Sequence, residues 1–148
     1  MTHYQYGRYI SCVYRSFQKF LKIRLMDVDL RPLEFRVLLI LVHRDGASQE
    51  EIAEGLTIDK SVIARVAKSI IQNGYIVRKV NQEDRRAYCL FRTLRAIEFD
   101  ETMMAILEEW EDIILEKVPE EERDHFSELM KDVFFHTKLT VKKIQQED

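Results

Sequence analysis

The sequence predicts a mainly α-helical fold that carries one small β-hairpin in its second half. Apolar residues recur every three or four positions over most of the 148 residues, which is the spacing of one face of a helix. Two short runs of strand-type residues, 75–77 and 87–91, interrupt this pattern. Only four glycines and two prolines are present, so few positions break the helices.

The first two helices are expected at 6–25 and from Pro32 to about His43. Apolar residues follow the helical spacing through the first segment, and Asp-Val-Asp at 27–29 ends it. Pro32 suits the first turn of the second helix, because the N–H group that proline lacks has no partner there. Arg-Asp-Gly at 44–46 ends this helix.

A short third helix and a fourth helix at 60–73 are expected next. Ser48 and Glu51 have the spacing of a capping box, in which each side chain accepts a hydrogen bond from an N–H group at the helix start. Asp59 is a candidate N-cap of the fourth helix, and Gly74 closes that helix as a left-handed C-cap. The expected buried face of the fourth helix consists of Val62 or Ile63, Val66, Ala67, Ile70 and Ile71.

Two long helices are expected after the hairpin. Thr93 caps the fifth helix, and Pro119, followed by three glutamates, ends that helix and opens a sixth. The residues expected to share one face of the fifth helix are Leu94, Ile97, Met103 or Met104, Leu107, Trp110, Ile114 and Val118. Long apolar faces on the first, fifth and sixth helices exceed what one small domain can cover, which predicts a homodimer.

Positive charge is concentrated in the middle of the chain. Residues 59–95 hold nine Lys or Arg against three Asp or Glu, a net charge of +6. Residues 96–148 hold six against sixteen, a net charge of −10, and the whole chain carries −3. The basic centre can therefore contact phosphate groups although the total charge is negative.

Three short helices followed by a hairpin is the element order of a winged helix-turn-helix, which binds double-stranded DNA. One helix lies in the major groove, and the hairpin, or wing, reaches the neighbouring minor groove. Arg85 and Arg86 lie in the turn of the hairpin, where a guanidinium group can enter a narrow and strongly negative minor groove. Asp84, next to them, can hold one guanidinium fork in a fixed direction.

The segment 48–93 resembles the core of the MarR family of transcriptional regulators. The features that carry the resemblance are Gln49-Glu50-Glu51-Ile52-Ala53, Asp59-Lys60-Ser61, Arg65, Gly74-Tyr75-Ile76, Arg78 and Asp84-x-Arg86. The resemblance implies one domain over 1–148, with a winged-helix DNA-binding core at 31–93 and a helical dimerisation region at 1–30 and 94–148. It also implies a cytoplasmic homodimer that binds a pseudo-palindromic operator, usually as a repressor. Such a repressor is released by a small, often aromatic, acid or by oxidation.

The resemblance also assigns candidate DNA-binding residues, by position. They are Lys60, Ser61, Val62, Ala64, Arg65, Lys68, Asp84, Arg85 and Arg86. The fourth helix would face the major groove, while Arg86 would enter the minor groove with Asp84 orienting it. Val62 and Ala64 depart from the small hydroxyl residues that the family often has, and they can touch a thymine methyl group but cannot hydrogen-bond a base edge. The usual Leu-Thr-x-x-Gly after the wing is Arg-Thr-Leu-Arg-Ala at 92–96, which keeps the Thr cap and lacks the glycine.

Two alternative functions stay open at the level of the sequence. A winged-helix protein-interaction module would dock another protein through its wing and helices, although the basic strip at 59–95 argues against a neutral partner. A cysteine-based redox-responsive regulator would use Cys12. We expect Cys12 to be buried in the first helix and Cys89 to pack within a strand, and buried cysteines are usually inert.

The sequence shows no pattern typical of an enzyme, a metal site or a membrane span. Ser, His and Asp residues occur without a nucleophile elbow, a phosphate loop or metal-ligand spacing. No apolar run approaches the roughly 18–20 residues that cross a membrane, and the N-terminus lacks the pattern of a signal peptide. We therefore expect a cytoplasmic DNA-binding protein with no catalytic activity, no metal and no cofactor.

Overall fold

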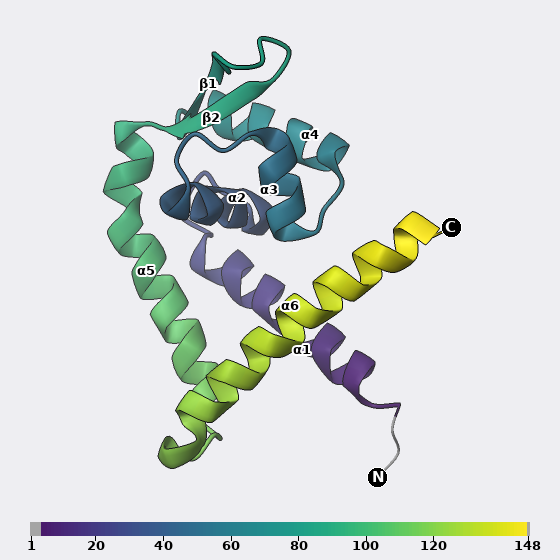
Figure 1. Cartoon of the computed structure of the whole chain (residues 1–148). Coiled ribbons are helices and arrows are strands. Elements are labelled where there is room, and N and C mark those ends of the chain that lie inside the picture. Colours follow the sequence, from purple (N-terminus) through teal and green to yellow (C-terminus); the bar gives the residue numbers. More distant parts are fainter. Residues whose placement is uncertain (1–3, 148) are drawn as a thin grey trace. The chain divides into compact units, whose positions relative to one another are not determined.

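The computed structural model describes residues 4–147 and divides into two compact units after Leu107 (Figure 1). The first unit contains α1 (Tyr6–Arg24), α2 (Pro32–His43), α3 (Gln49–Leu56), α4 (Lys60–Gln72), β1 (Ile76–Val80), β2 (Tyr88–Arg92) and the first part of α5 (Leu94–Leu115). The second unit contains the rest of α5, the 3₁₀ helix η1 (Glu120–Glu122) and α6 (Arg123–Glu147). The predicted mainly helical fold with one antiparallel hairpin is confirmed.

Local signals in the sequence explain where most of these helices begin and end. Pro32 occupies the first turn of α2. At the start of α3, the Glu51 N–H donates to Ser48 Oγ (3.1 Å) and the Ser48 N–H donates to Glu51 Oε2 (2.8 Å), which is the predicted capping box. Gly74, with φ of 79°, follows the C-cap of α4 in the left-handed region, as predicted.

The predicted N-cap position of Asp59 is confirmed, but its side chain does not form the capping hydrogen bond. Its backbone carbonyl oxygen instead accepts from the N–H groups of Val62 (3.0 Å) and Ile63 (3.2 Å). Because a main-chain carbonyl oxygen already accepts from those N–H groups, the first turn of the helix does not need the Asp59 carboxylate. Asp59 is exposed.

The core of the first unit is formed by buried residues of α2, α3, α4 and the hairpin, with Leu21 of α1 and with Ala96, Met103 and Ile106 of α5. On α4 the residues that are fully buried are Ile63, Ala67 and Ile70, while Val62 is half-buried, so the choice between Val62 and Ile63 falls on Ile63. Burial of this face orients α4 and leaves its opposite face exposed.

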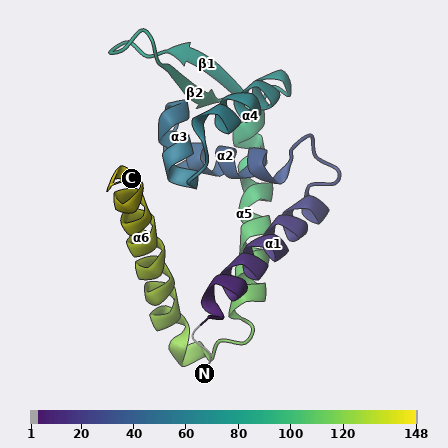
Figure 2. The same ribbon diagram turned by 90° about the vertical axis from the view of Figure 1, so that its right-hand side faces the viewer.

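The hairpin is a two-stranded antiparallel sheet in which Ile76 pairs with Arg92 and Val80 pairs with Tyr88. The loop that joins β1 to β2 projects beyond α2, α3 and α4 in both views (Figures 1 and 2). At its other end the hairpin packs on Gly46, whose φ of 88° is a left-handed conformation. A Cβ atom at Gly46 would lie 2.8 Å from the Phe91 ring, so this close approach requires glycine.

The buried face of α5 in the first unit differs from the predicted one. Ala96, Met103 and Ile106 are buried, whereas Leu94 and Ile97 are exposed. The cause is Phe99, whose ring makes edge-to-face contacts with Phe35 of α2 (centroids 6.5 Å apart) and with Tyr75 (6.1 Å). This aromatic packing sets the rotation of the helix about its axis and selects Met103 over Met104.

In the second unit, α6 is amphipathic but has no buried residue within 123–147. Its large exposed apolar residues are Leu129, Met130, Val133, Phe134, Phe135, Leu139, Val141 and Ile144. Among the helices of residues 4–147, none is both long and apolar enough to cross a membrane.

Candidate nucleic-acid interface

The exposed face of α4 carries the predicted polar residues. Ser61, Arg65 and Lys68 are exposed at helical spacing, and Gln72 continues the same row one turn further on. The sequence interpretation missed Gln72, although its distance of seven residues from Arg65 is a signal for the same face. Four side chains that can form hydrogen bonds therefore line one side of this helix.

The other predicted residues of α4 occupy different positions. Val62 and Ala64 are half-buried on the two flanks of that row. Only part of each side chain is therefore available to contact a molecule that binds to the exposed face of α4. Lys60 is exposed at the start of the helix, with its Nζ 4.0 Å from Oε2 of Glu50 in α3. A pair this exposed is weak and leaves Lys60 able to meet a phosphate group.

The loop at 81–87 has a defined hydrogen-bonded shape. The Asn81 N–H donates to the Ala87 carbonyl oxygen (2.9 Å), which closes the loop, and the Ala87 N–H donates to the Asp84 carbonyl oxygen (3.0 Å). Inside it, the Glu83 N–H donates to Asn81 Oδ1 (3.0 Å). Asn and Asp side chains that bond the main chain two residues on are typical of tight turns. Arg85 and Arg86 are exposed within this loop.

Asp84 contacts Arg86 differently from the sequence-based expectation. Its Oδ1 accepts from the backbone N–H of Arg86 (3.0 Å). Within residues 4–147, no ion pair between the Asp84 carboxylate and the Arg86 guanidinium group is formed. The carboxylate thus shapes the main chain from which Arg86 extends. In a two-residue turn, the backbone N–H of Arg86 lies closer to the Asp84 carboxylate than the guanidinium group does.

The strands of the hairpin carry further cations over aromatic rings. The guanidinium carbon of Arg78 lies 4.7 Å from the centroid of the Tyr88 ring, and Lys79 Nζ lies 4.8 Å from the centroid of the Phe91 ring. Such stacking limits the directions in which the two cations point while leaving them exposed. These residues add positive charge along the hairpin.

A groove of about 450 Å³ separates α3 from the hairpin loop. It brings together three of the predicted residues, Lys60, Asp84 and Arg86, with Glu50 and Glu54 of α3. The groove therefore presents both signs of charge, and an anionic polymer that follows it would meet the two cations beside carboxylates.

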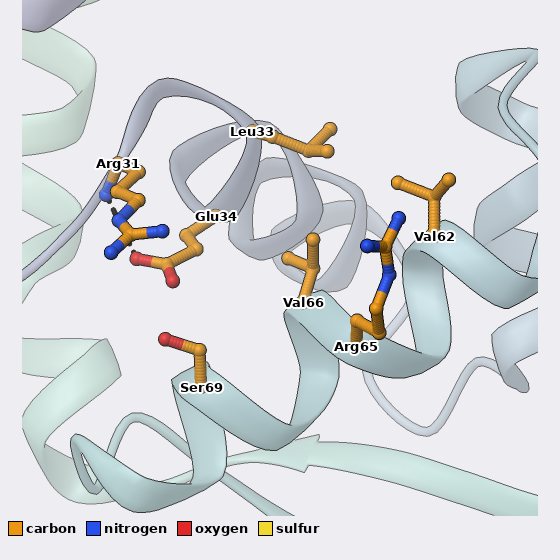
Figure 3. Close-up of a pocket in the computed structure, with 7 residues that line it drawn as sticks. All are labelled: Arg31, Leu33, Glu34, Val62, Arg65, Val66 and Ser69. Atoms are coloured by element: carbon orange, nitrogen blue, oxygen red, sulfur yellow. Dashed lines mark hydrogen bonds between the residues drawn. The ribbon is translucent and has the colours of Figure 1, made fainter.

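A second pocket, of about 360 Å³, lies between the start of α2 and α4 (Figure 3). The residues that line it are Arg31, Leu33, Glu34, Val62, Arg65, Val66 and Ser69. Glu34 is buried, and its Oε2 accepts from the backbone N–H of Arg31 (2.8 Å). The sequence interpretation did not identify this pocket, because Arg31 and Arg65 are far apart in the chain.

The cysteines differ partly from expectation. Cys12 is exposed, not buried, because it lies on the outer side of α1, where Arg15 Nη2 donates to its Sγ (3.5 Å). Cys89 is half-buried in β2. Among residues 4–147, no group of three or more His, Cys, Asp or Glu side chains is arranged to hold a metal ion.

Comparisons with known proteins agree with this geometry. The MarR family model matches residues 28–87. The chain is 25% identical over 123 residues to the HTH-type transcriptional regulator BilQ of Clostridium symbiosum, covering 82% of this chain and 85% of BilQ. It superposes on a MarR transcriptional regulator from Methanosarcina mazei with a TM-score of 0.85, at 27% identity over 91% of this chain and 96% of that one.

A third comparison concerns the fold alone. A Listeria monocytogenes protein assigned to the same family, crystallised in complex with 26mer DNA, superposes with a TM-score of 0.83 at 24% identity, over 92% of this chain and 93% of that one. The family model, the two relatives above 24% identity and the winged-helix architecture all indicate the same family of regulators. This chain therefore shares the sequence pattern of the MarR family over residues 28–87 and, over most of its length, the winged helix-turn-helix fold of MarR-family transcriptional regulators.

Proposed function

We propose that this chain is a cytoplasmic homodimeric repressor that binds a pseudo-palindromic DNA operator and is released from it by a small-molecule effector. The observation that carries the proposal is the pair of exposed basic elements, the Arg65 row of α4 and the Arg85–Arg86 loop of the hairpin. In a winged helix-turn-helix these two elements meet the major groove and the minor groove. The named relatives are transcriptional regulators, which supports a regulatory role without catalysis.

Base recognition by α4 rests on its polar row. Arg65 can form the bidentate contact with guanine O6 and N7, and Ser61 and Gln72 can donate to or accept from base edges. Val62 and Ala64 offer only apolar contact and are half-buried. Lys60 and Lys68 are suited to phosphate groups, which fix the register of the protein on DNA without reading its sequence.

The distribution of charge favours DNA over a protein partner. The net charge of +6 over 59–95 belongs to the segment that forms α4 and the hairpin. A neutral protein partner would leave these cations without counterparts, whereas DNA supplies phosphates along the whole surface. An affinity that falls steeply with salt is therefore the signature that separates DNA binding from the protein-docking alternative.

Exposed apolar faces support the homodimer. On α1, the exposed apolar residues include Tyr6, Tyr9, Ile10, Val13 and Tyr14. The α6 residues from Leu129 to Ile144 form a second exposed apolar series. Monomeric soluble proteins rarely expose extended apolar surface, and a second copy of the chain can bury it.

Selection from random duplex DNA is expected to recover an inverted repeat. Two-fold symmetry of the dimer requires two half-sites whose centres lie about one helical turn, roughly 10 base pairs, apart. Light scattering on the same sample should give twice the mass of one chain. A monomer in light scattering, or selected sequences without a repeat, would contradict the dimeric-operator proposal and favour docking to a protein.

The pocket between α2 and α4 supports release by an anionic effector. Two guanidinium groups, of Arg31 and Arg65, line it together with the apolar side chains of Leu33, Val62 and Val66. This combination fits a small aromatic acid, because the ring can contact the apolar residues while the carboxylate pairs with a guanidinium group. A ligand that engages Arg65 competes with DNA for the same side chain.

Benzoate and its hydroxylated derivatives are expected to release DNA from the protein at concentrations where acetate of equal ionic strength does not. Arg31→Ala should raise the concentration needed for half release by about tenfold, since it removes one of the two guanidinium groups that line the pocket. Fluorescence anisotropy of a labelled operator measures the release. Equal release by acetate, or an unchanged response of Arg31→Ala, would exclude this pocket as the effector site.

A further inference from the structure

The centre of β2 is fixed to the body of the first unit. The Leu90 N–H donates to the Ala47 carbonyl oxygen, and the Gly46 N–H donates to the Leu90 carbonyl oxygen, both at 2.9 Å. The Leu90 side chain is fully buried. Leu90 is therefore a fixed point, with Arg92 on one side of it along the strand and the Arg85–Arg86 loop on the other.

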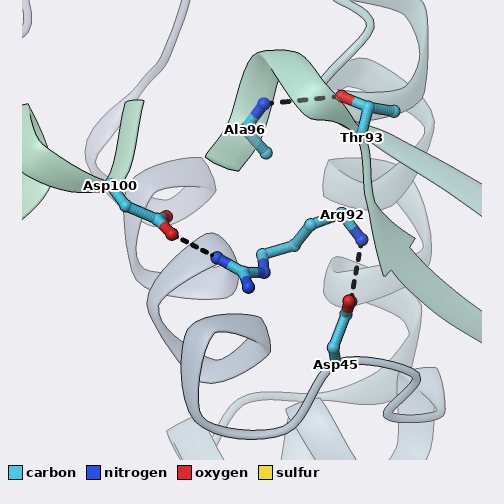
Figure 4. Close-up of polar contacts among 5 residues, drawn as sticks. All are labelled: Asp45, Arg92, Thr93, Ala96 and Asp100. Carbon is cyan, nitrogen blue, oxygen red and sulfur yellow. Dashed lines mark hydrogen bonds and ion pairs between the residues drawn. The ribbon is translucent and has the colours of Figure 1, made fainter. Parts of the chain in front are cut away.

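Arg92, at the end of β2, is held from two further directions (Figure 4). Its backbone N–H donates to Oδ1 of Asp45, in the loop between α2 and α3 (2.8 Å). Its Nη1 donates to Oδ2 of Asp100, in α5 (2.6 Å). The Arg92 side chain is 15% exposed and that of Asp100 is 30% exposed. Partial burial shields this ion pair from the salt that weakens exposed pairs.

The ion pair contains a single hydrogen bond, from Arg92 Nη1 to Asp100 Oδ2. The Nε of Arg92 and the Oδ1 of Asp100 are buried and have no hydrogen-bond partner among residues 4–147. A partly buried charge with a single partner responds strongly to the loss of that partner. The orientation of Arg92 therefore depends on Asp100.

We propose that the Arg92–Asp100 ion pair positions the wing for DNA binding. The pair holds the end of β2 in place. Because β2 is also fixed at Leu90, the pair sets the direction in which the opposite end of the strand presents Arg86. This inference rests on the proposed DNA-binding function. From Leu90 to Arg86 the chain extends about 13 Å at roughly 3.3 Å per residue. A tilt of about 10° at Leu90 would then displace the loop by about 2 Å, more than a hydrogen bond tolerates. Arg92 and Asp100 act through the strand and are not placed on the DNA.

The test is a double-mutant cycle between Asp100→Ala and Arg86→Ala, measured as affinity for the selected operator. Asp100→Ala alone should weaken binding about fivefold, although it removes a negative charge from a protein that binds a polyanion. In the Arg86→Ala background the same substitution should change the affinity less than about twofold, because the side chain whose direction it controls is gone. Glu98→Ala, an exposed residue on the same helix, is the matched control and should not weaken binding.

A purely structural role predicts a different result. If Asp100→Ala acted only through stability, its effect would be the same in both backgrounds, and that outcome overturns the inference, as does unchanged affinity. Should Asp100→Ala unfold at the assay temperature, the cycle uses Arg92→Leu with Asp100→Leu, which leaves no buried charge but removes the directional bond. Unchanged affinity of this double variant likewise overturns the inference. If the wild-type protein selects no DNA, the proposed function fails and this inference with it; if it binds DNA and the cycle shows no coupling, only this inference fails.

Discussion

Arg86→Ala is expected to weaken operator binding by about 1–3 kcal/mol and to lower the slope of log affinity against log salt by about one unit. The guanidinium group is exposed in the closed loop at 81–87, which projects beyond the helices of the first unit (Figure 2). A charge inserted in a narrow minor groove contributes both to affinity and to the release of counterions. Titrations of a labelled operator at several salt concentrations measure both quantities.

Arg85→Ala is the matched comparison, since it removes the same charge from the neighbouring exposed residue. We expect a smaller loss of affinity than for Arg86→Ala, because only Arg86 has its backbone N–H fixed by Asp84. The thermal unfolding of both variants should match that of the wild type, as neither side chain is in the core. Equal losses for the two variants would show that the loop acts through its total charge alone.

Features that depend on neighbouring residues could be predicted from the sequence. Pro32, the Ser48–Glu51 capping box and Gly74 each act within one turn of a helix end, so their positions fixed the bounds of α2, α3 and α4. The hairpin followed from two runs of strand-type residues around a polar loop. In each case the physical cause lies within about five residues of the feature itself.

Features that depend on tertiary packing could not be predicted in the same way. The apolar pattern of α5 allowed more than one buried face, and the choice depended on Phe99 meeting Phe35 and Tyr75. The exposure of Cys12 has a similar origin, because amphipathic spacing shows that a helix has two faces without showing which one the rest of the chain covers.

The same distinction applies to the candidate site. The polar row of α4 and the Arg86 loop follow from helical spacing and from position in the hairpin, and Gln72 belongs to that row by the same spacing. The pocket that joins Arg31 to Arg65, and the pair of Arg92 with Asp100, need two segments to be brought together by folding. A periodic pattern in the sequence does not show which distant segments folding brings into contact.

Two substitutions of Asp84 separate three explanations of its role. Asp84 Oδ1 accepts from the backbone N–H of Arg86 (3.0 Å), and an asparagine side chain carries an oxygen that can accept the same bond without a charge. We therefore expect Asp84→Ala to weaken operator binding by about 1–2 kcal/mol, because the loop loses the bond that orders Arg86. Asp84→Asn should bind as tightly as the wild type or more tightly, since the turn persists and a charge that repels phosphate is gone.

The other two explanations predict other signs. If only the charge of Asp84 mattered, both variants would bind DNA more tightly, because each removes one negative charge beside a polyanion. If the carboxylate held the guanidinium fork by an ion pair, both variants would bind more weakly, since neither keeps that pair. Parallel titrations of the two variants against one operator at one salt concentration decide among the three. Weaker binding by Asp84→Asn would reject the backbone turn as the role of Asp84, because that variant keeps the turn's acceptor and loses only the charge.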